Sequence, residues 1–351
     1  MSRQTLTAIL PQKAEAVLLT SPHNLRYFTG FSGGEGVALL CEDGGYLFVD
    51  SRYTTQALEE TTDVTVIEIH AKNREEILQK HLSPLKSIGY EEGQLTVGAF
   101  DGFLKFAPKS DWIKLSQDLE ELRMVKTEEE LNCLRRAEAI GAEAFLAVLP
   151  QIKIGVTENE IAAEIEYQMR KRGSSGTSFE TIVVSGYKSS MPHGKPDYKK
   201  IENGDFVTMD FGCVYQGYCS DMTRTVAVGS ITKEQETIYQ TVKEAQVQGL
   251  STIRAGVLGK EADFAARKVI EDAGYGAYFG HSLGHGVGLL IHELPNLSPR
   301  SETVLKPNMV VTCEPGIYIP KLGGVRIEDM VCVTEDGIEN LTQVPKDLLI
   351  L

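Results

Sequence analysis

The amino-acid sequence predicts a two-domain α/β protein of the α+β type. Its 351 residues are enough for two hydrophobic cores, and 42% apolar with 24% charged residues is typical of a folded chain. Short apolar runs alternate with helix-like stretches up to about residue 105, whereas longer, capped helices begin near residue 124. We therefore expect a small mixed α/β domain over residues 1–124 and a larger domain over residues 125–351.

The expected first domain consists of short strands and helices in alternation. Apolar runs predict strands at residues 14–20, 37–50 and 64–69, and the second of these forms a hairpin that turns at residues 42–45. Residues 54–60 and 73–82 have the composition and spacing of helices. This alternation predicts a mixed sheet of modest size.

Capping boxes mark the helices of the second domain. Thr127, Thr157 and Thr232 are each followed three residues later by Glu or Gln, so the hydroxyl and the later side chain can cap each other's backbone amides. The helix after Thr157 should end at Gly173, because glycine readily adopts the left-handed conformation that follows a helix.

Two segments of the second domain resemble each other. Residues 207–212 and 311–316 both read V-T-x-[D/E]-x-G, and each precedes another acidic strand that carries Asp221 or Glu328. We interpret this domain as two related α/β units that place corresponding acids on one surface. Chance similarity between short β segments is the alternative.

Charge and cysteine usage restrict the partners and the compartment. The net charge is −14, and no dense Lys/Arg block offers a surface for a phosphate backbone, so we expect no nucleic-acid partner. No signal-peptide pattern or long apolar segment is present, so we expect no membrane partner. The six cysteines are scattered without a CxxC pair. These features predict a cytoplasmic protein with reduced thiols.

Two acids lie within apolar strand sequence. If Tyr215-Gln216 is a two-residue hairpin loop, Asp210 lies directly opposite Asp221. Like charges in such positions are destabilising, so a cation should lie between them. A proton shared by the two acids, or an ion pair with Arg224, would also relieve the repulsion.

Glu314 and Glu328 are embedded in apolar sequence in the same way, which makes four strand-embedded acids in total. Two divalent cations would balance that charge. Oxygen-rich ligation suits Mn²⁺, and one imidazole makes Co²⁺, Zn²⁺ or Fe²⁺ acceptable. His281, His285 and His292 fall within twelve residues and offer that imidazole.

A competing motif lies in the same stretch. Residues 280–284 fit the G-x-S-x-G nucleophile elbow, with Ser282 at the centre. The elbow requires a strand before it, a helix after it and a later histidine, but no histidine follows His292. HExxH, Walker A and G-x-G-x-x-G motifs are absent. We therefore disfavour serine hydrolase, zincin, NTPase and dehydrogenase functions.

The order of four acids and one histidine along the chain resembles the pattern of a known family. Asp210, Asp221, His285, Glu314 and Glu328 lie within MDFG…SDMTRT, GHxxGHGVGL…HE, EPGIY and RIED. This pattern is similar to that of the proline-specific metallopeptidases of the pita-bread fold, namely Xaa-Pro dipeptidases (prolidases) and aminopeptidases P. It covers roughly residues 125–350, and the preceding part resembles the small creatinase-like N-terminal domain of the same enzymes.

The resemblance implies an activity. A pita-bread domain with an internal pseudo-twofold repeat would hydrolyse Xaa-Pro bonds with two divalent metal ions, most simply Mn²⁺. The compact chain favours a dipeptidase. An aminopeptidase P that acts on longer peptides, or a non-catalytic binding protein on the same fold, is the alternative.

The resemblance also implies residue roles. Asp221 and Glu328 would bridge the two ions, Asp210 would hold one ion, and His285 and Glu314 would hold the other. Glu314 would also carry a proton to the leaving nitrogen. The remaining family positions comprise His292 and His193 as catalytic residues and His281, Arg326 and Tyr318 as substrate-binding residues.

An assembly state follows from the resemblance as well. Residues 27–36 correspond to a loop that, in the family, often approaches the active site of a neighbouring subunit. The glycines and aromatic residues of this segment fit a mobile lid, and they fit a plain turn equally well. We accordingly expect a homodimer that binds small Xaa-Pro peptides.

Overall fold

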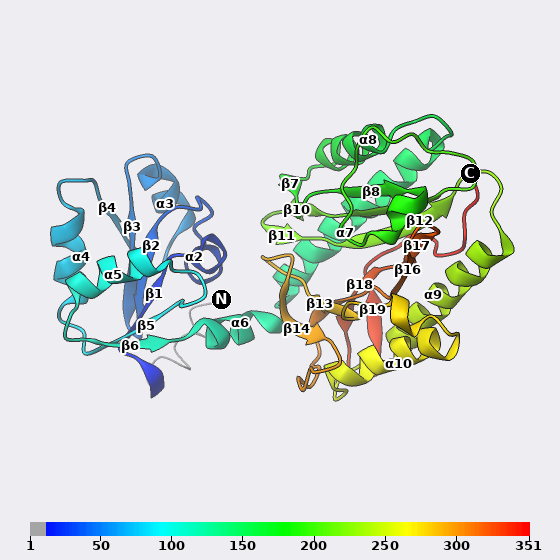
Figure 1. The fold of residues 1–351 in the computed structure, drawn as a ribbon. Helices are drawn as coiled ribbons and strands as arrows, with labels where there is room; N and C mark the ends of the chain where they lie inside the picture. Colours follow the sequence, from blue (N-terminus) through cyan, green and yellow to red (C-terminus); the bar gives the residue numbers. More distant parts are fainter. Residues whose placement is uncertain (1–11) are drawn as a thin grey trace. The chain divides into compact units, whose positions relative to one another are not determined.

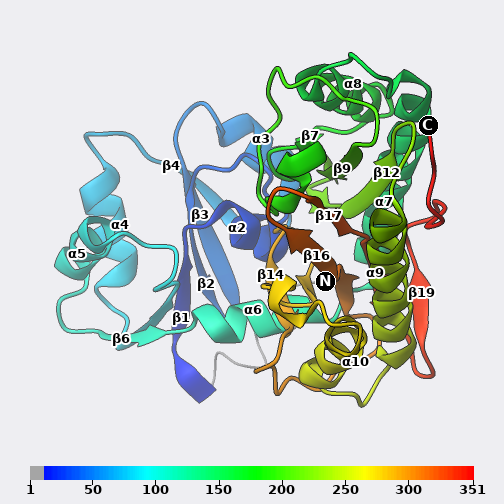
Figure 2. The ribbon, with the colours of Figure 1, turned by 45° about the vertical axis from the view of Figure 1, so that its right-hand side comes forward.

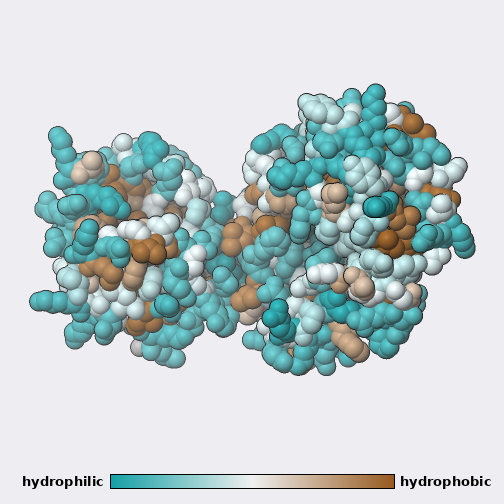
Figure 3. Space-filling view, in the orientation of Figure 1, coloured by the Kyte–Doolittle hydropathy of each residue, from teal (hydrophilic) through white to brown (hydrophobic). Residues whose placement is uncertain are grey.

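The computed structural model describes residues 12–351 and divides into two compact units, with the boundary between Leu122 and Arg123 (Figure 1). On the face shown in Figure 3, hydrophilic side chains cover most of the surface of each unit, as a highly charged chain requires. Among the described residues, no helix has both the length and the apolar character needed to cross a membrane.

The first unit is built on a six-stranded mixed sheet in the order β4-β3-β2-β1-β5-β6. Its strands are β1 (Ala16–Leu19), β2 (Val37–Cys41), β3 (Gly44–Val49), β4 (Thr65–Glu68), β5 (Ser87–Tyr90) and β6 (Asp111–Lys114). Its helices are α2 (Pro22–Thr29), α3 (Thr54–Glu60), α4 (Arg74–Leu82) and α5 (Val97–Phe106), and α6 (Ser116–Met124) crosses the boundary.

Alternate residues of the central strand enter different cores. Val17 and Leu19 pack into one hydrophobic cluster, and Ala16 and Leu18 pack into another, so the sheet is covered on both faces. The predicted strands and both predicted helices of this unit are confirmed. The hairpin is confirmed as well, since Cys41 pairs with Gly44 across a two-residue loop.

The second unit contains two helix pairs, each packed on its own strands. The helices are α7 (Glu128–Val148), α8 (Glu158–Lys171), α9 (Lys233–Thr252) and α10 (Gly259–Asp272). All three predicted capping boxes are present, and Gly173 follows α8 with φ of +102°. Figures 1 and 2 show α8 and α10 at opposite ends of the unit.

The strands of the second unit form four sheets. They are ordered β11-β10-β7, β12-β9-β8, β14-β13-β15-β18-β19 and β16-β17. The first two sheets contain β7 (Gly176–Thr177), β8 (Ile182–Ser185), β9 (Phe206–Phe211), β10 (Cys213–Tyr215), β11 (Tyr218–Cys219) and β12 (Met222–Ala227). The others contain β13 (Gly284–Gly286), β14 (Glu293–Leu297), β15 (Val310–Cys313), β16 (Gly316–Ile319), β17 (Gly323–Arg326), β18 (Asp329–Val333) and β19 (Ile338–Asn340).

Corresponding acids occupy corresponding places in the two halves of this unit. One core joins α7 and α8 to β8, β9 and β12, and another joins α9 and α10 to β15 and β18. Asp221 directly precedes β12, just as Glu328 directly precedes β18. Asp210 lies near the end of β9, and Glu314 directly follows β15. This arrangement agrees with the interpretation of two related α/β units.

The predicted register of the first acid pair is wrong by two residues. The hairpin loop is Gln216-Gly217 instead of Tyr215-Gln216, and Asp210 therefore pairs with Thr223. Both loop residues have positive φ, +46° and +80°, which a two-residue hairpin turn of this kind requires and which glycine adopts without strain. Asp221 lies outside the ladder, between β11 and β12.

Candidate metal centre

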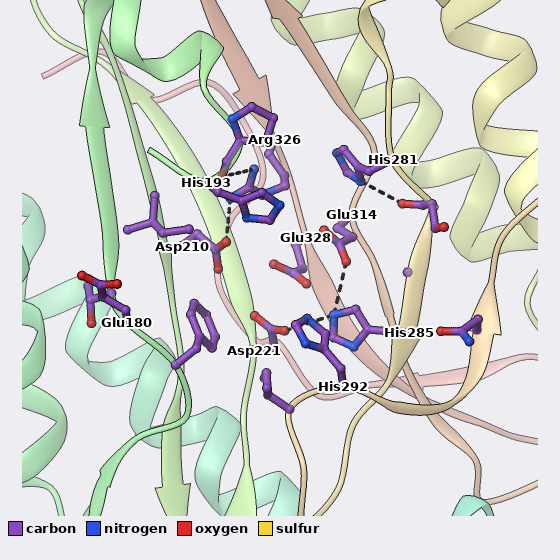
Figure 4. Close-up of a pocket in the computed structure, with 18 of the residues that line it drawn as sticks. Glu180, His193, Asp210, Asp221, His281, His285, His292, Glu314, Arg326 and Glu328 are labelled. Carbon is purple, nitrogen blue, oxygen red and sulfur yellow. Dashed lines mark hydrogen bonds and ion pairs between the residues drawn. The ribbon is translucent and has the colours of Figure 1, made fainter. Parts of the chain in front are cut away.

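A pocket of about 530 Å³ lies in the second unit and contains the predicted site (Figure 4). All five residues expected to bind metal line it, and so do His193, His281, His292 and Arg326. Strand ends of both halves therefore deliver their acids to one cavity, and β13 supplies His285. Figure 4 shows the carboxylates of Asp210, Asp221, Glu314 and Glu328 gathered at its centre.

Three of these residues meet the geometric requirement for a metal site. Asp221, His285 and Glu328 each offer a ligand atom, and these atoms all lie within 4.8 Å of one another. The His285 Nε2 lies 3.5 Å from Asp221 Oδ2 and 3.4 Å from Glu314 Oε1. Asp210 lines the same pocket beside this group. The sequence prediction therefore named residues that the fold brings together.

Local hydrogen bonds orient the imidazole. The Nδ1 of His285 lies 3.1 Å from the carbonyl oxygen of Gly286, which leaves Nε2 directed at the carboxylates. The His285 backbone amide donates to Thr312 Oγ1 at 3.1 Å, and that hydroxyl donates to Glu314 Oε1 at 3.2 Å. Thr312 thus links the two ligands from neighbouring strands, as partners behind metal ligands commonly do.

The cluster has the charge of a site that requires cations. Burial and the neighbouring carboxylates raise the pKa values of Asp221 and Glu328 well above their ordinary range. Burial also raises the pKa of Glu314 to about 8 and lowers that of His285 to about 4, so the imidazole stays neutral. Among the described residues, Asp210 Oδ1 is buried without a hydrogen-bond partner. The donor set therefore fits divalent metal ions.

Arg326 connects several of these groups. Its Nη2 donates to Asp210 Oδ2 at 2.6 Å, and its Nη1 donates to Tyr318 Oη at 2.9 Å. Its Nε donates to Thr223 Oγ1 at 3.0 Å, and this hydroxyl donates to Glu328 Oε2 at 2.7 Å. One guanidinium thus orients two acids of the cluster.

The alternative ion pair with Arg224 does not form. Arg224 Nη2 lies 2.8 Å from Asp329 Oδ1, and this buried pair is separate from Asp210 and Asp221. The serine-hydrolase motif lacks its context as well, because Ser282 is followed by the short strand β13 instead of a helix.

The other histidines that line the pocket lie around the cluster. His281 Nε2 is 2.9 Å from Tyr318 Oη, so a chain of hydrogen bonds runs from His281 through Tyr318 to Arg326. The rings of His292 and His285 lie edge to face, with centroids 4.4 Å apart. Figure 4 shows His193 beside Arg326, above Asp210.

One buried acid next to the site, Glu138, was not predicted from the sequence. Glu138 lies on α7 and is fully buried, and its carboxylate accepts from the Asp221 amide at 3.3 Å and from Thr342 Oγ1 at 2.6 Å. Burial raises its pKa to about 7. A signal was present, because Glu138 follows Leu134 by one helical turn and thus lies on the apolar face of the predicted helix.

Comparison with known proteins agrees with this geometry. Residues 132–335 match the model of metallopeptidase family M24, and residues 4–125 match the creatinase/prolidase N-terminal domain. The chain belongs to metallopeptidase family M24. The expected pita-bread fold and two-domain architecture are thereby confirmed. Membership of this family also makes the protein a metal-dependent peptidase.

Relatives of this M24 peptidase match it over nearly their whole length. The Xaa-Pro dipeptidase of Pyrococcus furiosus is 41% identical over 336 residues, which is 95% of each chain. The structure of the Xaa-Pro dipeptidase from Bacillus anthracis has a TM-score of 0.96 and 42% identity, covering 100% of this chain and 99% of the other. The X-Pro aminopeptidase from Thermotoga maritima has a TM-score of 0.91 and 39% identity, covering 96% and 98%.

Proposed function

We propose that this M24 peptidase is an Xaa-Pro dipeptidase that uses two divalent metal ions. The observation that carries the proposal is the cluster of four carboxylates, two buried and two half-buried, and one neutral imidazole in a single pocket. The Xaa-Pro dipeptidases of Pyrococcus furiosus and Bacillus anthracis, at 41% and 42% identity, support the choice of bond and substrate length.

The family resemblance guides the assignment of the metal ligands. By that resemblance, Asp221 and Glu328 would contribute to holding both ions. Asp210 would complete one site, and His285 with Glu314 would complete the other. Mn²⁺ fits this carboxylate-rich set. When bound, such ions lower the pKa of a water molecule and polarise the scissile carbonyl.

Glu314 is the residue that moves the proton. Burial raises the pKa of Glu314 to about 8 in the metal-free pocket, and bound cations would lower it, so this carboxyl can alternate between its charged and protonated forms during turnover. The nitrogen of an Xaa-Pro bond carries no hydrogen, so it must receive a proton before proline can leave. A carboxylic acid within the pocket supplies that proton without requiring an N–H on the substrate.

The histidines and Arg326 position the substrate. His292 and His193 line the pocket and would contact the peptide at its reacting carbonyl. Tyr318 and Arg326 hold the ring of His281 through their shared hydrogen bonds, so that histidine presents a fixed face to the substrate. These roles require no movement of the strands.

Steady-state kinetics on Ala-Pro and Ala-Pro-Ala test the proposal. We expect a strong preference for the dipeptide with metal-loaded protein. A preference for the tripeptide would instead identify an aminopeptidase, the activity named for the Thermotoga maritima structure. Stoichiometric metal without hydrolysis of either peptide would identify a binding protein. Reconstitution of the apo-protein separately with Mn²⁺, Co²⁺ and Zn²⁺ tests the choice of ion.

We also propose a cytoplasmic homodimer. None of the six cysteines forms a disulfide, which suits a reducing compartment. The family resemblance of residues 27–36, where α2 ends and a glycine-rich loop begins, supports dimerisation. Light scattering on the full chain measures the oligomeric state, and a monomeric mass would contradict the proposed homodimer.

A further inference from the structure

The basic side chains that line the pocket are those of Arg326 and Lys195. Arg326 is only 4% exposed, and its guanidinium already donates to Asp210, Tyr318 and Thr223. A further contact of Nη1 to the carbonyl oxygen of Pro192 measures 3.3 Å. Arg326 therefore has little capacity left for a charged ligand.

Lys195 is in the opposite situation. Its side chain is 72% exposed, and its Nζ lies 2.6 Å from Glu180 Oε2, whose side chain is 66% exposed. Figure 4 shows Glu180 at the edge of the pocket, apart from the central carboxylates. An ion pair between two such exposed groups is weak, so another anion can replace Glu180 at little cost.

His281 does not provide a positive charge at neutral pH. Burial lowers its pKa to about 4. Asn296 lines the pocket and can donate a hydrogen bond, but its amide carries no charge. A substrate anion at this end of the pocket therefore has the exposed ammonium group of Lys195 as its available partner.

The backbone of Lys195 is held in place. Its carbonyl oxygen accepts from Lys188 Nζ at 3.0 Å, and Lys188 is bound in turn by the fully buried Glu158. Glu158 Oε1 also accepts from the Ser185 amide at 2.7 Å, which holds the start of the segment between Ser185 and Lys195. Lys195 thus combines an anchored backbone with a side chain that is free to exchange partners.

We infer that Lys195 binds the free carboxylate of the dipeptide and so determines the preference for substrates that end at proline. The inference rests on the proposed Xaa-Pro dipeptidase activity and adds to it the residue that reads substrate length. In a longer peptide the proline carboxyl is an amide without charge, so the attraction to Lys195 is lost.

Kinetics with Ala-Pro and Ala-Pro amide test this inference, because the two substrates differ only in that charge. In Lys195→Met we expect KM for Ala-Pro to rise about fivefold with kcat nearly unchanged, and the kinetics on the amide to match those of the wild type. In Glu180→Gln the competing anion is gone, so KM for Ala-Pro should fall. Added salt should raise KM for Ala-Pro and leave the amide unaffected.

Lys233→Met is the matched control. Lys233 is also exposed and pairs with Glu236 at 2.9 Å, but it does not line the pocket, so the variant should behave as wild type. An equal loss on both substrates in Lys195→Met, or the same rise in KM in Lys195→Met and Glu180→Gln, would show a merely structural ion pair and overturn the inference. Wild-type protein that hydrolyses neither substrate would overturn the proposed function itself.

Discussion

Arg326 donates to one carboxylate oxygen of Asp210 at 2.6 Å, while the other oxygen is buried with no hydrogen-bond partner among the described residues. Half of this carboxylate is therefore held by the protein, and half remains available to a ligand in the pocket. Because Arg326 also reaches Glu328 through Thr223, it orients two acids from different halves of the unit. One guanidinium cannot neutralise four acids, which is why the cluster still requires metal ions.

Substitution Arg326→Lys should weaken metal binding about 10- to 100-fold, the usual effect of losing a residue that orients metal ligands. An ammonium is a point charge and cannot hold Asp210, Tyr318 and Thr223 at once. Metal content after dialysis measures the effect. Arg136→Lys on the surface, where Arg136 pairs with Glu143, is the control and should keep its metal. Full metal occupancy in Arg326→Lys would refute the orienting role.

Substitution Glu314→Ala should abolish turnover and lower the metal content, since in the proposed mechanism this residue is both a metal ligand and the proton carrier. Ser282→Ala should keep its activity within a few-fold, because Ser282 lacks the strand and helix of a nucleophile elbow. Hydrolysis of Ala-Pro and metal analysis measure both variants. If Ser282→Ala were inactive and Glu314→Ala were active, the proposed mechanism would be wrong.

Substitution Gly212→Ala should lower the free energy of unfolding by about 3 kcal/mol and reduce metal content. A Cβ at this position would lie 1.8 Å from the carbonyl oxygen of Ser220, which is backbone and cannot move without displacing the strand before Asp221. Gly141→Ala on α7 is the contrast, since its Cβ would meet no atom closer than 3.6 Å. Urea unfolding should find the second variant as stable as wild type or more so.

The stability of the protein should fall as the pH drops from 6.5 toward 4, in part because of His281. Burial and the nearby Arg326 lower the pKa of His281 to about 4, whereas an unfolded chain takes up the proton near 6.5. Within that window the unfolded state binds more protons, so acid favours unfolding. His281→Asn should therefore show a shallower dependence of Tm on pH, and identical slopes would contradict the assignment.

Local sequence signals predicted much of the fold because they act over a few residues. The boxes at Thr127, Thr157 and Thr232 each need only a hydroxyl and a side chain three positions later, and all three formed. The predicted strand register between Asp210 and Asp221 was wrong because the register depends on which two residues of the hairpin turn adopt positive φ. That choice could have been made from Gly217, the glycine at the turn.

The sequence could name residues that line the pocket, but not the contacts between them. Acids within apolar strand sequence stand out, so the candidate ligands could be named from the sequence. Contacts such as Arg326 with Asp210, or Glu138 with the Asp221 amide, join residues 116 and 83 positions apart. Nothing in the local pattern specifies such distant pairs, because they arise only from how the two halves pack.

The division of the ligands between two halves ties metal uptake to assembly. Asp210 and Asp221 lie in or next to strands that pack on α7 and α8, and the other three candidate ligands lie in or next to the later strands. Neither half supplies all five candidate ligands, so bound metal ions would link the two halves of the second unit. Metal binding should therefore require that both halves have folded. Removal of the metal ions by a chelator should lower the stability of both halves together.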